Sequence, residues 1–322
     1  MNVVLLILDA LRYDHVNKDN TPNLMRVAEQ GAFFRNAFAC NSSTINSIPC
    51  ILGSDTEYKP DHNIASVLGG QGYYTAMIHS NPIVHSFYGG FRETIDLKSS
   101  KFKVSKGWKK TLRSNLPPQI IASMKKLRAS VYEDDTYLPY SRAQETLEFT
   151  SKWMKDHSRY FLWVHLMDPH IPYYPRNTSL GISKHDMRTL NDKLIESVHG
   201  NYVPKPEEVE TAKTLYSENI GEMDHEIGVF MEGFPEDTLL VVTSDHGEEF
   251  GEHGQYSHHS DKIVPELVHV PLIFYGAGVA EGHVVEEYVS NLSVAPTILE
   301  SSGVDQKLGR GTSLWSIIRK RP

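Results

Sequence analysis

Two unbroken apolar runs stand out along the chain, and each leads directly to residues that can bind a metal ion. The first run, residues 2–8, stops at Asp9. The second run, residues 238–242, leads to Asp245 and His246. Runs this rich in β-branched residues are typical of strands buried on both faces of a parallel sheet. Because open α/β sheets bind ligands at the carboxyl ends of their strands, we expect these side chains to meet there around one divalent cation, although each is also common at ordinary strand ends.

The remaining periodicity predicts a layered α/β fold. Residues 74–78 and 160–164 are further short runs of the strand type, whereas residues 140–157 and 215–230 repeat their apolar side chains with helical spacing. Strands that alternate with helices are typical of a doubly wound α/β/α sandwich with a mostly parallel central sheet. No repeat or low-complexity run interrupts the chain, so we expect residues 1–322 to form a single catalytic domain.

A hydroxyl-rich segment supplies a candidate nucleophile. Ser42, Ser43 and Thr44 precede an apolar stretch that reaches Leu52, which predicts a turn running into a helix. The free N–H groups and the dipole at a helix start favour an anion, and a bound metal can deprotonate a hydroxyl placed there. The same hydroxyls are also ordinary helix caps. Composition alone does not distinguish which of the three attacks.

Five motifs follow one another in a recognisable order along the chain. They are Asp9, the helix start near Thr44, residues 165–173 (HLMDPHIPY), residues 244–248 (SDHGE), and residues 251–254 (GEHG) followed by His258. This order, which continues to residues 295–299, resembles the sulfatase family of the alkaline phosphatase superfamily. The resemblance implies an alkaline-phosphatase-like three-layer α/β/α sandwich and a metal-dependent enzyme.

The segment around Thr44 is most similar to that of the phosphoethanolamine transferases in the same superfamily. Their catalytic threonine is followed by a Ser-x-Pro-Cys stretch, matched here by residues 47–50, and has a cysteine on either side, matched by Cys40 and Cys50. The resemblance implies that Thr44 attacks the substrate and also joins the three predicted metal ligands. The two cysteines form a bridge only in an oxidising compartment, and in cytosol we expect two thiols.

Three departures from the sulfatase pattern change the expected chemistry. No segment near Thr44 carries the Cys/Ser-x-Pro-x-Arg motif that sulfatases convert to formylglycine, so we do not expect that group. Asp9 is followed by Ala10 in place of a second aspartate, and Asp245-His246 replaces the usual Asp-Asn pair. One carboxylate fewer and one nitrogen more favour zinc or manganese, with calcium or magnesium as the alternatives.

The resemblance places further polar residues around this centre. It implies that His170 lies opposite the metal and contacts the substrate, and that His258 lies beside the transferred group. We expect one of these two histidines to protonate the departing oxygen. Asn81, His165 and His253 are weaker candidates for substrate contacts. Half-buried, hydrogen-bonded imidazoles and an ordinary Asn-Pro turn explain these three equally well.

The candidate residues together predict cleavage or transfer of a phosphoryl group through a covalent phospho-threonine at Thr44. The expected substrates are anionic phosphodiesters, phosphonates, and phosphoethanolamine or phosphoglycerol esters, either free or linked to a lipid or glycan. A sulfate-ester hydrolase is one alternative, although a plain threonine sulfate lacks the second hydroxyl by which formylglycine hydrate expels sulfate. A metal- or lipid-binding module without catalysis is the other.

Charge is distributed unevenly along the chain. Residues 98–128 are rich in Lys and Arg with interleaved aromatics, and the sign reverses at residues 133–135, whereas the whole chain has a net charge of -8. We expect residues 98–135 to form a basic insertion or lid that contacts an anionic membrane surface or substrate, unless it is a solvated helical face. No nucleic-acid partner is expected. The sequence shows no signal peptide or membrane-spanning run, so we expect a cytoplasmic protein or the soluble piece of an anchored one.

Overall fold

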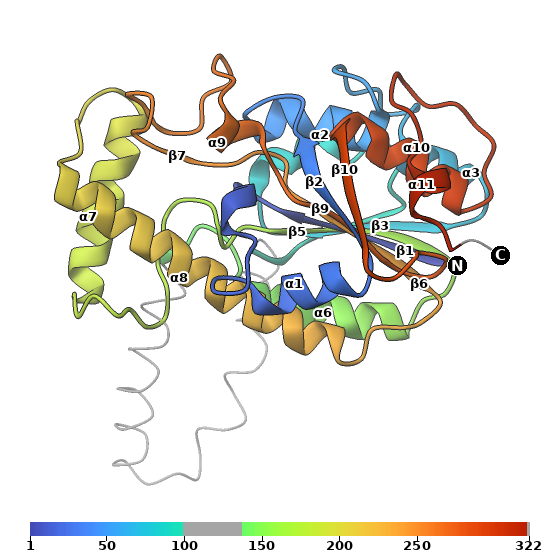
Figure 1. Cartoon of the computed structure of the whole chain (residues 1–322), viewed down its shortest axis with the longest axis horizontal. Helices are drawn as coiled ribbons and strands as arrows, with labels where there is room; N and C mark the ends of the chain where they lie inside the picture. The colour runs from blue at the N-terminus through green and yellow to red at the C-terminus, as the bar shows by residue number, and fades with distance from the viewer. Residues whose placement is uncertain (99–136, 321–322) are drawn as a thin grey trace, which may run out of the picture.

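An eight-stranded sheet lies at the centre of the computed structural model, which describes residues 1–98 and 137–320 (Figure 1). Its strands follow the order β10-β2-β9-β6-β1-β5-β3-β4. Their bounds are β1 (Asn2–Leu8), β2 (Ala32–Phe38), β3 (Tyr74–His79), β4 (Glu93–Asp96), β5 (Tyr160–Leu166), β6 (Thr238–Thr243), β9 (Leu272–Gly276) and β10 (His283–Ser290). Strand β9 runs antiparallel to both of its neighbours, and the other paired strands of this sheet are parallel. The prediction of a mostly parallel α/β sheet is confirmed.

Helices cover both faces of the sheet and complete three layers (Figure 1). One face carries α1 (Pro22–Glu29), α6 (Ala143–Lys155) and α8 (Pro206–Met231), and the other carries α2 (Thr44–Gly53), α3 (Ile64–Gly70), α10 (Val294–Ser301) and α11 (Trp315–Ile318). The elements at the margins are α7 (Lys184–Val198), α9 (Pro265–Val268), the two-stranded sheet of β7 (Glu249–Phe250) and β8 (Tyr256–Ser257), and the 3-10 helices η1 (Tyr13–His15), η2 (Pro82–Phe87) and η3 (Asn291–Ser293). The alkaline-phosphatase-like sandwich predicted from the sequence is therefore observed.

Strand β1 shows why the first apolar run forms a central strand. All seven of its residues are buried. Side chains on successive positions of a strand point to opposite faces. Those on the α2 side are Val3, Leu5 and Ile7, and those on the α8 side are Val4, Leu6 and Leu8. A strand with helices on both faces needs an unbroken apolar run, which is what residues 2–8 provide.

The register of the central strands brings the predicted metal ligands together. Ile7 pairs with Thr243 of β6 and with His165 of β5. Asp9 and Asp245 each lie two residues beyond the Ile7–Thr243 pair, so both leave the sheet at the same height. The convergence expected from the ends of two apolar runs is therefore a direct consequence of parallel pairing.

One predicted helix is longer than its apolar spacing indicated. The spacing predicted a helix over residues 215–230, whereas α8 begins at Pro206. Proline is favoured at the first helical position, and the acidic residues Glu207 and Glu208 suit the positive end of the helix dipole. The first turn of α8 is mostly exposed, so it carries no apolar stripe that could have revealed it.

The predicted basic insertion, residues 98–135, lies outside the described residues except for Lys98. Its contact with a lipid surface or a substrate therefore stays a prediction. Within residues 1–98 and 137–320, no helix has both the length and the apolar character that crossing a membrane requires.

Candidate active site

Three side chains meet at the carboxyl edge of the sheet, and we call them the metal triad: Asp9, Asp245 and His246. All three are completely buried, and their candidate ligand atoms lie within 4.8 Å of one another. His246 Nε2 is 3.6 Å from Asp9 Oδ1 and 3.7 Å from Asp245 Oδ2. This spacing brings two carboxylates and one imidazole around one small space.

The hydrogen bonds of the metal triad show that it fits a metal ion. Asp9 Oδ1 and Asp245 Oδ2 are buried and have no hydrogen-bond partner among the described residues. His246 Nδ1 lies 2.8 Å from the carbonyl oxygen of Gly247, so this nitrogen donates and Nε2 keeps its lone pair. Leaving buried carboxylate oxygens without partners is costly. A divalent cation held by these three atoms removes that cost.

The electrostatics of the triad also favour positive charge at its centre. Burial alone would raise the pKa of Asp9, but the nearby His170, His165 and His246 hold that pKa well below its usual range. Burial alone would lower the pKa of His246, but Asp245 and Asp9 outweigh it and raise that pKa. Two buried acidic side chains facing one imidazole thus form a cluster that suits a divalent cation.

Two residues predicted as weak substrate contacts form hydrogen bonds to Asp9, and their contact with a substrate stays a prediction. His165 Nε2 lies 2.8 Å from Asp9 Oδ2, and Asn81 donates to the same oxygen from Nδ2 at 2.9 Å. Both residues are buried. Asn81 also accepts a hydrogen bond from the backbone N–H of Ile83 and so begins η2. The two side chains fix one oxygen of Asp9 and leave the other, Oδ1, facing the centre of the triad.

Thr44 is the hydroxyl residue that reaches the metal triad. It is the first residue of α2, it is buried, and its Oγ1 lies 3.3 Å from His246 Nε2. Ser42 Oγ donates to the carbonyl oxygen of His259, and Ser43 Oγ donates to the side chain of Asn41. No side chain caps the start of α2. Asn46 and Ser47 donate their N–H groups to the carbonyl oxygen of Ser43, and the positive end of the helix dipole at Thr44 suits an anion.

A disulfide bond between Cys40 and Cys50 brackets Thr44. The two Cα atoms are 6.5 Å apart and ten residues separate the cysteines in sequence. Cys40 follows the end of β2 and Cys50 lies in the second turn of α2. Of the two states left open by the sequence, the structure has the bridged one, and the bridge ties the start of α2 to the preceding loop.

The histidines predicted as catalytic lie next to the triad. The ring of His258 is 4.2 Å from that of His246 and 5.0 Å from that of His170, measured between centroids. His170 Nδ1 lies 2.5 Å from the carbonyl oxygen of Ile171. Burial and the neighbouring His246 lower the pKa of His258 against the opposing effect of Glu248. These positions suit proton donation and charge stabilisation at the same centre.

Glu248 is a buried residue of the site that the sequence did not single out as functional. Its Oε1 lies 3.2 Å from His258 Nδ1. Its place three residues after Asp245 in the SDHGE motif was the available signal. His253, by contrast, lies with Nε2 3.0 Å from Glu266 and a side chain that is 42% exposed. Among the contacts of the described residues, none joins His253 to the metal triad.

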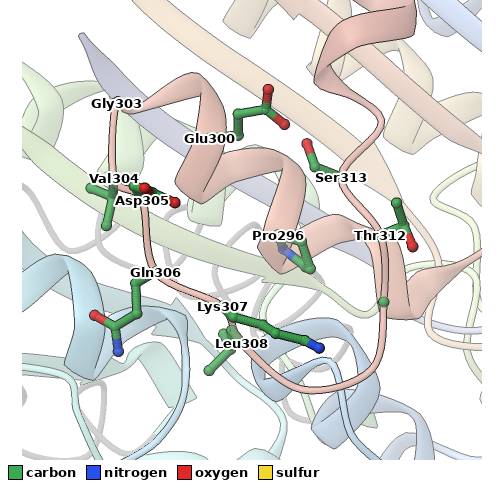
Figure 2. A pocket seen from close by; sticks show the side chains of 11 residues that line it. Pro296, Glu300, Gly303, Val304, Asp305, Gln306, Lys307, Leu308, Thr312 and Ser313 are labelled. Carbon is green, nitrogen blue, oxygen red and sulfur yellow. The ribbon is translucent and has the colours of Figure 1, made fainter.

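Figure 2 shows a surface hollow of about 650 Å³ that is separate from this site. Glu300 and Lys307 line it, as does Gly311, whose N–H donates to Ser54 Oγ at 2.7 Å. Ser54 ends α2, a helix of ten residues. At about 1.5 Å per residue, the hollow lies roughly 15 Å from Thr44 at the other end of the helix. None of the predicted site residues lines it.

The three-layer fold is that of enzymes of the alkaline phosphatase superfamily. The family model for sulfatases matches residues 1–304, and the chain belongs to that family. A low-salt glycan biosynthesis sulfotransferase of Haloferax volcanii is 26% identical over 98% of this chain and 64% of its own length. An arylsulfatase of Clostridium perfringens is 23% identical over 99% of this chain and 79% of its own length. The chain thus spans about two thirds of the first of these relatives.

Solved structures show the same fold. A phosphonate monoester hydrolase from Silicibacter pomeroyi aligns with a TM-score of 0.65 and 21% identity, over 97% of this chain and 75% of that one. The soluble domain of lipooligosaccharide phosphoethanolamine transferase A from Neisseria meningitidis aligns with a TM-score of 0.62 and 16% identity, over 93% and 86%. At these identities the likeness concerns the fold.

Proposed function

We propose that this chain cleaves or transfers a phosphoryl group through Thr44. The observation that carries the proposal is the position of Thr44 Oγ1, 3.3 Å from His246 Nε2 at the uncapped start of α2. A threonine hydroxyl is a weak nucleophile unless a base or a metal activates it. The hydroxyl contacts His246, whose Nε2 faces two carboxylate oxygens without a hydrogen-bond partner among the described residues, Asp9 Oδ1 and Asp245 Oδ2.

Asp9, Asp245 and His246 would hold the metal ion, for which we propose zinc or manganese because one ligand is nitrogen. A divalent ion there lowers the pKa of a neighbouring hydroxyl and neutralises charge on phosphoryl oxygens. Asn81 and His165 support this by holding the Oδ2 atom of Asp9.

The reaction has two halves, formation of a phospho-threonine at Thr44 and its release, and residues of the chain act in both. Thr44, deprotonated to its alkoxide with the proton released to solvent, attacks phosphorus in line through Oγ1, so that a new P–O bond forms as the bond to the departing oxygen breaks. The alkoxide is regenerated when the phosphoryl group leaves Thr44. The N–H groups of the first turn of α2 stabilise the charge on the other phosphoryl oxygens. His258 donates its proton to the departing oxygen, and His170 stabilises charge on the transferred group. Water or an acceptor hydroxyl then attacks phosphorus, returns a proton to His258 and frees Thr44.

A second candidate is cleavage or transfer of a sulfate ester at the same site. The observation that favours it is the sequence similarity to sulfatases and to a glycan sulfotransferase. The plain side chain of Thr44 weighs against it, because a threonine sulfate has no adjacent hydroxyl to expel the sulfate. For either chemistry we propose an anionic ester substrate, carried on a glycan or lipid.

A substrate panel distinguishes the two candidates. The full chain, loaded with zinc or manganese, is incubated with aryl phosphomonoesters, phosphodiesters, phosphonates and sulfates. We expect turnover of one phosphoryl class, loss of several orders of magnitude in Thr44→Ala, and a phosphoryl adduct on the peptide that contains Thr44. Ser43→Ala is the matched control and should keep activity. Turnover of sulfates alone would favour the second candidate, and metal binding without any turnover would indicate a binding module.

A further inference from the structure

His258 is held by a buried carboxylate that lies outside the metal triad. Its Nδ1 is 3.2 Å from Glu248 Oε1 and 3.3 Å from Ser257 Oγ. Glu248 is completely buried, and its Oε2 accepts a hydrogen bond from the Tyr173 hydroxyl at 2.9 Å. Both oxygens of this carboxylate therefore have partners. A buried carboxylate with a complete set of hydrogen bonds has little freedom to turn.

The backbone of Glu248 is fixed as firmly as its side chain. Its N–H donates to the carbonyl oxygen of Glu266 at 3.1 Å, and its own carbonyl oxygen accepts from Arg12 Nη1 at 3.1 Å. Arg12 is itself buried and forms ion pairs of 2.7 Å with Asp14 and Glu252. The carboxylate therefore presents Oε1 to His258 from a position that neighbouring elements determine.

We propose that Glu248 is a positioning residue that accepts the Nδ1–H of His258 and so fixes the tautomer and the orientation of its ring. The inference deepens the proposed reaction and rests on His258 acting in it. With Nδ1–H directed at Glu248, the reactive nitrogen is Nε2. In the first half-reaction the ring, protonated on both nitrogens, gives its Nε2 proton to the departing oxygen and is left as the neutral Nδ1–H tautomer. In the second half-reaction Nε2 takes a proton from the incoming water or hydroxyl, and Nδ1–H stays in place throughout.

The hydrogen bond between Glu248 and His258 matters because three imidazole rings lie close together. The ring of His258 lies between His246 and His170, at 4.2 Å and 5.0 Å between centroids. A ring without a fixed acceptor at Nδ1 can adopt the Nε2–H tautomer, which leaves Nε2 no lone pair for the second half-reaction. It can also turn over, which moves Nε2 away from the reacting oxygen. A carboxylate that orients a catalytic imidazole in this way is a recurring arrangement in enzymes.

The first test reads the tautomer directly and needs no turnover. Glu248→Met combined with Tyr173→Phe replaces both hydrogen-bonded partners with apolar groups of similar size, which limits the loss of stability. Nitrogen-15 chemical shifts of His258 are recorded on the metal-loaded full chain. We expect the Nδ1–H form in the wild type and its loss in the double variant. If the double variant keeps the Nδ1–H form, Ser257 or the surrounding packing fixes the ring and the proposal is wrong.

Glu249→Gln and Tyr173→Phe are the matched controls. Glu249 adjoins Glu248 in sequence and is equally buried. Its carboxylate pairs with Lys262 at 2.7 Å and accepts the backbone N–H of His253, so that it holds no imidazole ring. Both control variants should keep the Nδ1–H form of His258. A change of tautomer in Glu249→Gln equal to that in the Glu248 variant would mean that any buried charge in this segment has the same effect, which contradicts a specific role for Glu248.

The second test measures reaction rates. It can be made with Glu248→Gln if the double variant of Glu248→Met and Tyr173→Phe does not fold. Alkyl esters, whose leaving groups need a proton, should lose on the order of 10²-fold in kcat, and nitrophenyl esters much less. In a His258→Ala background the Glu248 variant should cause no further loss, since it acts through His258. Losses that multiply would show that Glu248 acts independently. Absence of turnover in the wild type would count against the proposed function and leave the tautomer result intact.

Discussion

Asp245 and Glu248 are buried carboxylates three residues apart, yet their surroundings are opposite. Asp245 keeps one oxygen, Oδ2, without a hydrogen-bond partner in the part of the chain that the structure describes, whereas Glu248 has partners for both. Burial is nearly complete for each side chain. The difference shows how one loop serves two purposes: a buried oxygen with a free lone pair indicates where a cation belongs, and a fully paired carboxylate indicates a neighbour being held in place.

Removing the free lone pairs should abolish metal binding. In Asp245→Ala and in His246→Ala we expect elemental analysis to find no bound divalent metal, because two remaining ligands hold a transition metal poorly. Glu248→Gln is the comparison and should retain its metal. Full occupancy in both triad variants would show that the metal is bound elsewhere.

Replacing His258 and replacing His170 should slow the reaction of different sets of substrates. His258→Ala should slow alkyl esters by about 10² to 10⁴-fold and activated nitrophenyl esters far less, because only a poor leaving group needs a proton. His170→Ala should slow both classes alike. Rates across a leaving-group series measure the difference. Equal slopes for the two variants would exclude both as the proton donor.

Asp168 is a third buried carboxyl, intermediate between these two. Its Oδ1 accepts from the N–H of Ala143, its Oδ2 has no partner among the described residues, and burial raises its pKa from 3.8 to about 6. A raised carboxyl pKa stabilises the folded state below pH 3.8, and the effect is lost as the pH rises toward 6. Relative to Asp168→Asn, the free energy of unfolding of the wild type should fall by about 2 kcal/mol between pH 4 and 7.

Denaturant titrations of both proteins across this pH range provide the measurement. Parallel curves for the wild type and Asp168→Asn would mean that Asp168 titrates normally. Such a result would remove Asp168 as an intermediate case between Asp245 and Glu248.

The smallest expected effect is that of removing one hydrogen bond to Asp9. Asn81→Ala removes one of two hydrogen bonds to Asp9 Oδ2, and we expect about a tenfold loss of metal affinity. Competition with a chelator measures it. His253→Ala is the control, since its side chain pairs with Glu266 and not with the triad. An unchanged affinity in Asn81→Ala would show that His165 alone holds Asp9.

The metal half of the site could be predicted because it follows from strand ends. Asp9 and Asp245 come directly after apolar runs, and parallel pairing aligns those ends. The assignment of Thr44 in place of Ser42 or Ser43 came from the family resemblance. The structure supplies the reason, since the other two hydroxyls donate to backbone and side-chain groups of neighbouring loops.

The hydrogen bonds around His258 could not be predicted in the same way, because the residues that form them are far apart in sequence. Glu248 and Tyr173 are separated by 75 residues, and no local pattern indicates that they share a hydrogen bond. The substrate contacts expected of Asn81 and His165 illustrate a related difficulty. Both residues lie at the correct edge of the sheet, but only the geometry shows that their polar atoms reach Asp9.

Helix α2 is tied to its surroundings at two points, by the Cys40–Cys50 bridge in its second turn and by the hydrogen bond from Gly311 to Ser54, the residue that follows its end. The backbone position of its first residue is thus set independently of the side chain that residue carries. In evolutionary terms, a change of one codon at Thr44 can replace the attacking atom, while the metal triad and the sheet stay as they are.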